Sequence, residues 1–126
     1  MKRTNVISRL ILTTLFFALT IFCFSPQISY ADAPQDVKLE YDSGTQTLTV
    51  TITHKSSFNF HHINNVEIKR NSGIISKNNY DSQPKDVPFT YTYKVDASEG
   101  DMLEVTATCS LSGSKTVTLK VPKATK

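Results

Sequence analysis

Apolar and polar residues alternate along most of the chain after residue 35, with the period of two that is typical of half-buried β-strands. No stretch of this region has the spacing of an amphipathic helix. The alternating segments are residues 37–41, 48–52, 66–68, 89–95, 103–107 and 117–121, and a further apolar pair, Ile74 and Ile75, follows a hairpin turn. Turn-forming residues separate many of them: DSG at 42–44, NSG at 71–73, EGD at 99–101 and SGS at 112–114. The pattern therefore predicts about seven short strands.

Seven short strands separated by turns at this spacing are typical of an all-β fold, and we expect an immunoglobulin-like seven-stranded antiparallel β-sandwich. The alternation covers one region without internal repeats or low-complexity tracts. Residues 32–126 are enough for one modest hydrophobic core and no second one. We therefore expect a single domain over residues 32–126.

The first 31 residues have the composition of a secretory signal peptide. Lys2, Arg3 and Arg9 form a positively charged start, and residues 10–24 are an uncharged, mostly apolar run. The sequence SYA at 29–31 then provides small residues where signal peptidase cleaves. The apolar run is shorter than the roughly 20 residues of a membrane span, although a retained N-terminal anchor is the alternative. We expect cleavage after Ala31 and an exported domain, periplasmic or secreted.

Cleavage changes the charge of the protein. The whole chain carries a formal net charge of +3, and the excess comes from the three basic residues of the predicted signal peptide. Residues 32–126 are balanced, with eleven basic and eleven acidic side chains. The predicted mature domain has no basic excess that would favour nucleic acid or an anionic membrane as a partner.

Cysteine and histidine provide the candidate chemistry. The chain has two cysteines, and Cys23 lies in the predicted signal peptide, so the mature domain would hold Cys109 alone and could form no internal disulfide. The three histidines, His54, His61 and His62, lie within nine residues. A thiolate with imidazoles is a donor set for soft or borderline metal ions.

Strand alternation predicts that these side chains converge. His54 continues the inward series of 48–52, and Cys109 continues that of 103–107, each at the last inward position of its strand. In an immunoglobulin-type sandwich the loops after the second and sixth strands emerge at the same end. We therefore predict a metal site at this end from His54, His61, His62 and Cys109. The alternatives are a cysteine that only packs in the core and solvated histidines.

Two segments resemble the superoxide reductase family, which includes desulfoferrodoxin and neelaredoxin. HKSSFNFHHINNVEI at 54–68 is similar to that family's HPxxxxHYIxWIEL, and TCSLSG at 108–113 is similar to its YCNLHG. The resemblance covers roughly residues 48–121 and again implies an immunoglobulin-like sandwich. It also implies one iron ion with four equatorial imidazoles and an axial thiolate, which reduces superoxide to hydrogen peroxide with electrons from a separate redox donor.

Carried over by position, the resemblance makes His54, His61 and Cys109 iron ligands and places His62 on the family's tyrosine. Strict alternation would instead place His62 on the inward face with Val66. We favour His61 and expect a break in the alternation between Ile63 and Val66, without excluding His62.

The chain also departs from the family pattern. Residues 32–53 contain no counterpart of its first histidine, and Ser112 stands where its last histidine would be. Three imidazoles and a thiolate could hold copper or zinc instead of iron. The alternative functions are therefore a non-catalytic copper or zinc carrier, and an immunoglobulin-like interaction module of an extracytoplasmic complex. The redox donor, any partner protein and the oligomeric state stay open.

Overall fold

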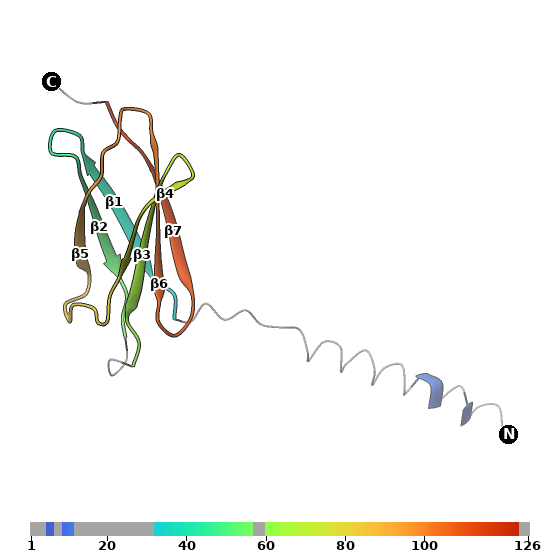
Figure 1. Ribbon diagram of the computed structural model, residues 1–126. Coiled ribbons are helices and arrows are strands. Elements are labelled where there is room, and N and C mark those ends of the chain that lie inside the picture. Colours follow the sequence, from blue (N-terminus) through green and yellow to red (C-terminus); the bar gives the residue numbers. More distant parts are fainter. Residues whose placement is uncertain (1–4, 7–8, 12–31, 57–59, 124–126) are drawn as a thin grey trace.

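Seven antiparallel strands in two sheets that face each other make up the computed structural model, which describes residues 5–6, 9–11, 32–56 and 60–123 (Figure 1). The strands are β1 (Asp36–Asp42), β2 (Thr47–Thr53), β3 (Ile63–Arg70), β4 (Gly73–Asn79), β5 (Phe89–Lys94), β6 (Met102–Cys109) and β7 (Ser114–Lys120). One sheet has the order β1-β2-β5 and the other β4-β3-β6-β7. The prediction of an all-β sandwich is confirmed.

The position of the fourth strand distinguishes this topology from that of constant-type immunoglobulin domains. In constant-type immunoglobulin domains the fourth strand belongs to the sheet of the first, second and fifth strands. Here β4 pairs with β3 and extends the other sheet. The finer immunoglobulin-like classification stays a prediction.

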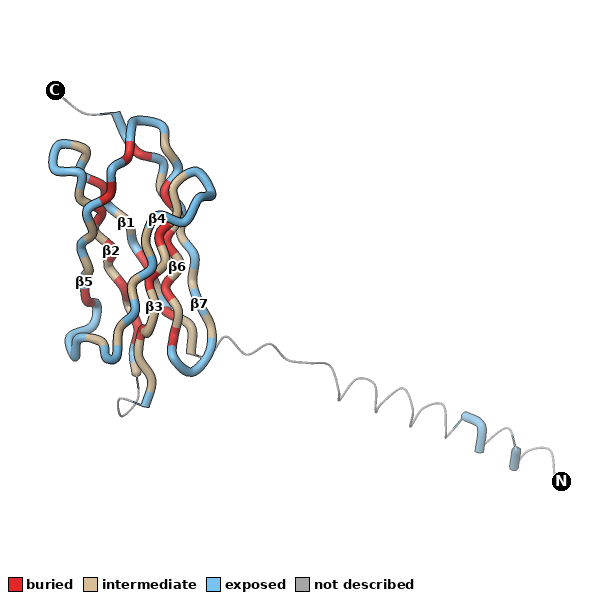
Figure 2. Tube along the Cα trace, in the orientation of Figure 1, coloured by how far each residue is buried: buried red, intermediate tan, exposed pale blue. Residues whose placement is uncertain are grey.

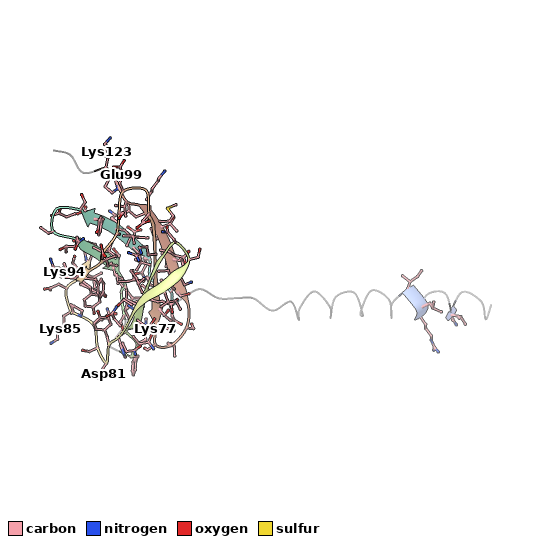
Figure 3. All side chains as sticks on the ribbon, turned by 45° about the horizontal axis from the view of Figure 1, so that its top comes forward. Lys77, Asp81, Lys85, Lys94, Glu99 and Lys123 are labelled. Atoms are coloured by element: carbon pink, nitrogen blue, oxygen red, sulfur yellow. The ribbon has the colours of Figure 1, made fainter. Side chains whose placement is uncertain are left out.

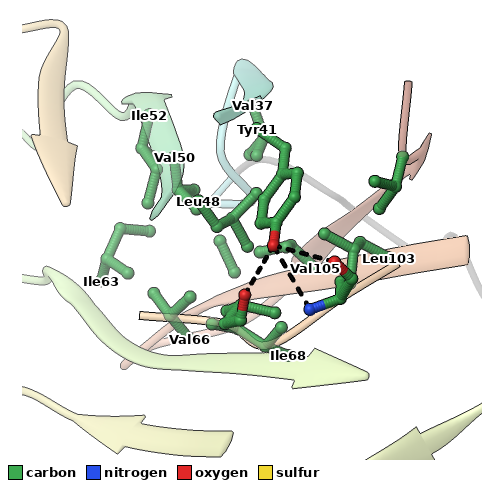
Figure 4. Close-up of a cluster of buried hydrophobic side chains, with 14 of the residues drawn as sticks. Val37, Tyr41, Leu48, Val50, Ile52, Ile63, Val66, Ile68, Leu103 and Val105 are labelled. Carbon is green, nitrogen blue, oxygen red and sulfur yellow. Dashed lines mark hydrogen bonds between the residues drawn. The ribbon is translucent and has the colours of Figure 1, made fainter. Parts of the chain in front are cut away.

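The core lies between the sheets, and most of its residues are inward positions that the alternation predicts. Buried positions recur along the strands, most regularly in β2 and β6 (Figure 2). The fully buried side chains include Leu48, Val50, Ile52, Ile63, Val66, Ile68, Leu103 and Val105. The buried Tyr41 hydroxyl donates to the Val95 carbonyl at 2.7 Å and accepts from the Ala97 N–H at 3.3 Å, so its polar atom is satisfied (Figure 4).

Each open side of the sandwich is covered differently. On one side, β1 and β7 are in direct contact. Another part of the boundary is covered by tyrosines, because Tyr80 stacks on Tyr91 with ring centroids 4.4 Å apart. The Tyr80 and Tyr93 hydroxyls lie 2.7 Å apart, and burial together with this hydrogen bond raises the pKa of Tyr93 above its ordinary value.

Most of the predicted signal peptide, including the cleavage site at 29–31, lies outside the described residues. Residues 5–6 and 9–11 are helical. Within the described part of the chain, no helix is long and apolar enough to cross a membrane. The domain boundary and export stay predictions.

Candidate metal centre

His54, His61 and Cys109 come together at one end of the sandwich. His54 follows the end of β2, His61 precedes the start of β3, and Cys109 is the last residue of β6, and these three points lie at the same end in Figure 1. One ligand atom from each residue lies within 4.8 Å of the other two. His54 and Cys109 are buried, with 0% and 3% of their surface exposed. The predicted convergence of these three residues is present in the structure.

A β-bulge in β3 places His61, rather than His62, beside Cys109. Ile63 lies opposite Cys109, and Asn65 lies opposite Thr108, so that Asn64 is an extra residue between two consecutive pairs. A bulge of this kind reverses the faces of the residues that precede it. Ile63 is therefore fully buried although it is three residues from the buried Val66. The predicted break in the alternation is confirmed, and it brings His61 onto the inward face.

The imidazole of His61 touches both other members of the cluster. Its Nδ1 lies 3.2 Å from the Cys109 Sγ. Its ring meets the His54 ring edge to face, with centroids 5.0 Å apart and an interplanar angle of 81°. The chain on either side is held in place because the Ser110 N–H donates to the His62 carbonyl at 2.8 Å. The contact between His61 and Cys109 is thus supported by backbone pairing next to it.

His54 is oriented by Gln83, which lies between β4 and β5. The Gln83 Oε1 accepts from the Ile63 N–H at 3.0 Å, and its Nε2 donates to the His54 carbonyl at 2.9 Å. These two backbone contacts fix which end of the amide is oxygen. That oxygen lies 2.7 Å from the His54 Nδ1, so Nδ1 must carry the proton. The neutral His54 ring then has its lone pair on Nε2.

Asp32 lies against both imidazoles. Its carbonyl oxygen is 3.1 Å from the His54 Nε2, and its Oδ1 is 3.8 Å from the His61 Nε2. The Ser112 hydroxyl donates to Oδ2 at 3.0 Å. A lone pair on the His54 Nε2 and a carbonyl oxygen repel each other at this distance unless a proton or a cation lies with them. A cation bound at the His54 Nε2 would relieve this repulsion.

His62 lies outside the cluster. Its Nε2 is 3.1 Å from the Tyr80 carbonyl oxygen, which accepts a hydrogen bond when the proton of the ring is on Nε2. It contributes instead to the wall of a pocket of about 310 Å³ beside the cluster, lined by His61, His62, Asp81, Ser82, Gln83 and Lys85. Figure 3 labels Asp81 and Lys85 at the end of the sandwich away from Glu99 and Lys123. The structure brings together three of the four predicted ligands and leaves His62 apart.

The three donor atoms are close to the spacing that a metal ion requires. A tetrahedral zinc ion, with bonds of about 2.0–2.3 Å, holds its ligand atoms about 3.5 Å apart. Because the atoms here lie within 4.8 Å of one another, side-chain movements of about 1 Å would suffice. The cluster can therefore hold a metal ion through two imidazoles and one thiolate.

The sequence pattern did not reveal Gln83 or Asp32 as part of this site. Gln83 lies in a segment without alternation, between β4 and β5. Asp32 is a single acidic residue next to the predicted cleavage site. Ser112, which contacts Asp32, stands where the family that the sequence resembles has its last histidine. A scan against protein-family models and a search of curated proteins return no match to this chain.

Proposed function

We propose that residues 32–126 form an exported domain that binds one copper or zinc ion through His54, His61 and Cys109. The observation that carries this proposal is the buried convergence of three donor atoms within 4.8 Å. The His61 Nδ1 and the Cys109 Sγ already lie 3.2 Å apart, and a metal ion would use both of these atoms as ligands. The donors would be the His54 Nε2, the His61 Nδ1 and the Cys109 Sγ. Gln83 faces the other nitrogen of His54, Nδ1, and the Asp32 carboxylate faces the other nitrogen of His61, Nε2.

The chemistry of the donors favours copper or zinc over a hard cation. A thiolate is a soft ligand, and imidazole suits both zinc and copper. Two histidines and one cysteine in a trigonal arrangement, with a weak additional oxygen, are typical of copper sites, and the Asp32 carbonyl lies beside His54 as such an oxygen. Zinc would use the same three donors with a fourth ligand.

The donor set does not fit the iron site that the family resemblance implies. That site takes four equatorial imidazoles, whereas the chain has three histidines and His62 faces the Tyr80 carbonyl. We therefore propose that the protein is a metal carrier rather than a superoxide reductase. A carrier would exchange the ion with a partner protein at the end of the sandwich where the pocket beside His61 opens.

The test is metal retention by residues 32–126 after anaerobic loading with Cu(I), Zn(II) or Fe(II) and desalting. We expect one equivalent of copper or zinc in the wild type and its loss in Cys109→Ser and His61→Ala. His62→Ala is the matched control, since it removes the neighbouring imidazole outside the cluster, and it should retain the ion. Metal content by mass spectrometry provides the measurement.

Three results would contradict the proposed function. Equal metal content in Cys109→Ser and the wild type would exclude the thiolate as a ligand. If no metal is retained, the remaining alternative is an immunoglobulin-like interaction module. One equivalent of iron, oxidised rapidly by superoxide, would favour the superoxide reductase interpretation over the carrier.

A further inference from the structure

Asp32 contacts the cluster of His54, His61 and Cys109, and it is also the residue that the predicted cleavage would expose as the N-terminus. Its carbonyl oxygen is 3.1 Å from the His54 Nε2. Its carboxylate lies 3.8 Å from the His61 Nε2, on the ring nitrogen that does not face Cys109. One residue next to the predicted cleavage site therefore contacts both histidines of the cluster.

The segment after Asp32 holds it there. A Cβ atom on Gly113 would come within 2.9 Å of the Ala33 Cβ, so the two segments are closely packed. Pro34 is buried. The Gln35 N–H donates to the Thr53 carbonyl at 2.8 Å, which continues the β1–β2 pairing, and the Lys115 Nζ donates to the Gln35 carbonyl at 2.7 Å. Asp32 is therefore fixed on the site by the fold rather than by its own side chain alone.

Among the residues that the structure describes, the cluster has no strong fourth donor. Zinc prefers four ligands, and His54, His61 and Cys109 provide three. The Asp32 carboxylate faces the outer nitrogen of His61 and the Ser112 hydroxyl, which suits a partner that orients a ligand rather than a ligand itself. As part of a neutral amide, the Asp32 peptide nitrogen is a poor donor for a metal ion, because its lone pair is delocalised into the carbonyl.

We infer that cleavage after Ala31 completes the metal site by making the α-amino group of Asp32 its fourth donor. This inference rests on the metal site proposed above. Hydrolysis of the Ala31–Asp32 peptide bond by signal peptidase consumes one water, and it leaves a carboxylate on Ala31 and an ammonium group on Asp32, which releases one proton when its nitrogen binds the metal. The amine nitrogen and the Asp32 carbonyl oxygen can then close a five-membered chelate ring on one ion. Export and acquisition of full metal affinity are thereby coupled.

The test compares three forms of the domain for zinc and Cu(I) affinity by competition with a chelator. The first begins at Asp32, the second retains Ala31, and the third begins at Asp32 with its α-amine acetylated. Loss of a partner that only orients a ligand costs about 10–100-fold in metal affinity, so loss of a direct donor should weaken binding at least about tenfold in the second and third forms. Metal should also protect the Asp32 amine from an acylating reagent, as read by mass spectrometry.

Asp32→Asn, with a free amine, is the matched control, because it removes the carboxylate but keeps the proposed donor, and its amine should stay protected. Equal affinity of the three forms, with an amine that reacts as fast with metal as without, would overturn the inference and leave the proposed function intact. Absence of metal binding by all three forms would overturn both. The unfolding free energies of the metal-free forms provide the control for folding. Equal values mean that a difference in metal affinity comes from loss of a donor and not from a disturbed fold.

Discussion

At the scale of single residues, the site depends on how one buried imidazole is held. His54 is fully buried, and burial of a polar ring is favourable only when both nitrogens have partners. Gln83 satisfies Nδ1 at 2.7 Å, and its own amide is held by the Ile63 N–H and the His54 carbonyl. The ring is thus oriented before any ion binds, and Nε2 is left for the cluster.

Gln83→Leu should therefore weaken metal binding by about 10–100-fold, because the His54 ring loses the partner that sets its tautomer and orientation. Gln83→Glu keeps an acceptor beside Nδ1, so its loss of affinity should be smaller. Competition titrations with a chelator measure both effects. Unchanged affinity in Gln83→Leu would show that Gln83 supports the loop but does not position His54.

At the scale of elements, the β6–β7 turn connects the cluster to the N-terminal segment. Gly113 has a positive φ of 84°, and its Cα faces Ala33, so a side chain there meets another part of the chain. Gly100, in the turn before β6, has a similar φ of 88° but no atom within 4 Å of the position of a Cβ. A side chain at Gly100 would therefore cause backbone strain alone, whereas a side chain at Gly113 would cause the same strain and also a steric clash.

Alanine at each glycine tests this difference. A non-glycine residue in the left-handed region costs roughly 1–2 kcal/mol, and both Gly100→Ala and Gly113→Ala should lose about that much unfolding free energy. Gly113→Ala should lose more, because its Cβ would displace Ala33, and it should also weaken metal binding by moving Asp32. Denaturant unfolding and metal titration provide the two measurements. Equal losses in both variants would mean that the contact with Ala33 relaxes without cost.

At the scale of the whole molecule, one core between two sheets stabilises a domain whose described cysteine is free. The site lies at one end of this core, since Cys109 ends β6, whereas Leu103 lies near the start of the same strand. Truncation of the core far from the cluster should therefore affect stability but not the donors.

Leu103→Ala should lower the unfolding free energy by about 2–5 kcal/mol, because Leu103 is fully buried and its removal leaves a cavity. Leu111→Ala is the control: this side chain is 66% exposed, and its loss should change stability by no more than about 0.5 kcal/mol. Under conditions in which both variants are folded, their metal affinities should match that of the wild type. A tenfold loss of affinity in Leu103→Ala would show that the donor geometry depends on the entire core.

The amino-acid sequence by itself determined the approximate positions of the strands, the inward face of most of them, and the presence of His54 and Cys109 at inward strand ends. Alternation is a local property, since successive side chains of an extended backbone point to opposite faces whatever lies around them. The turns followed from glycine, serine and asparagine for an equally local reason. A break in the alternation between Ile63 and Val66 could be expected from the family resemblance.

Only the tertiary structure decided which side chains meet. The bulge that selects His61 over His62 exists because β3 pairs with β6, a strand about forty residues later. Gln83 and Asp32 reach the cluster from segments without a periodic pattern, so nothing local marks them. Pairing register and loop placement depend on contacts between distant parts of the chain, and these contacts exist only after the two sheets have packed together.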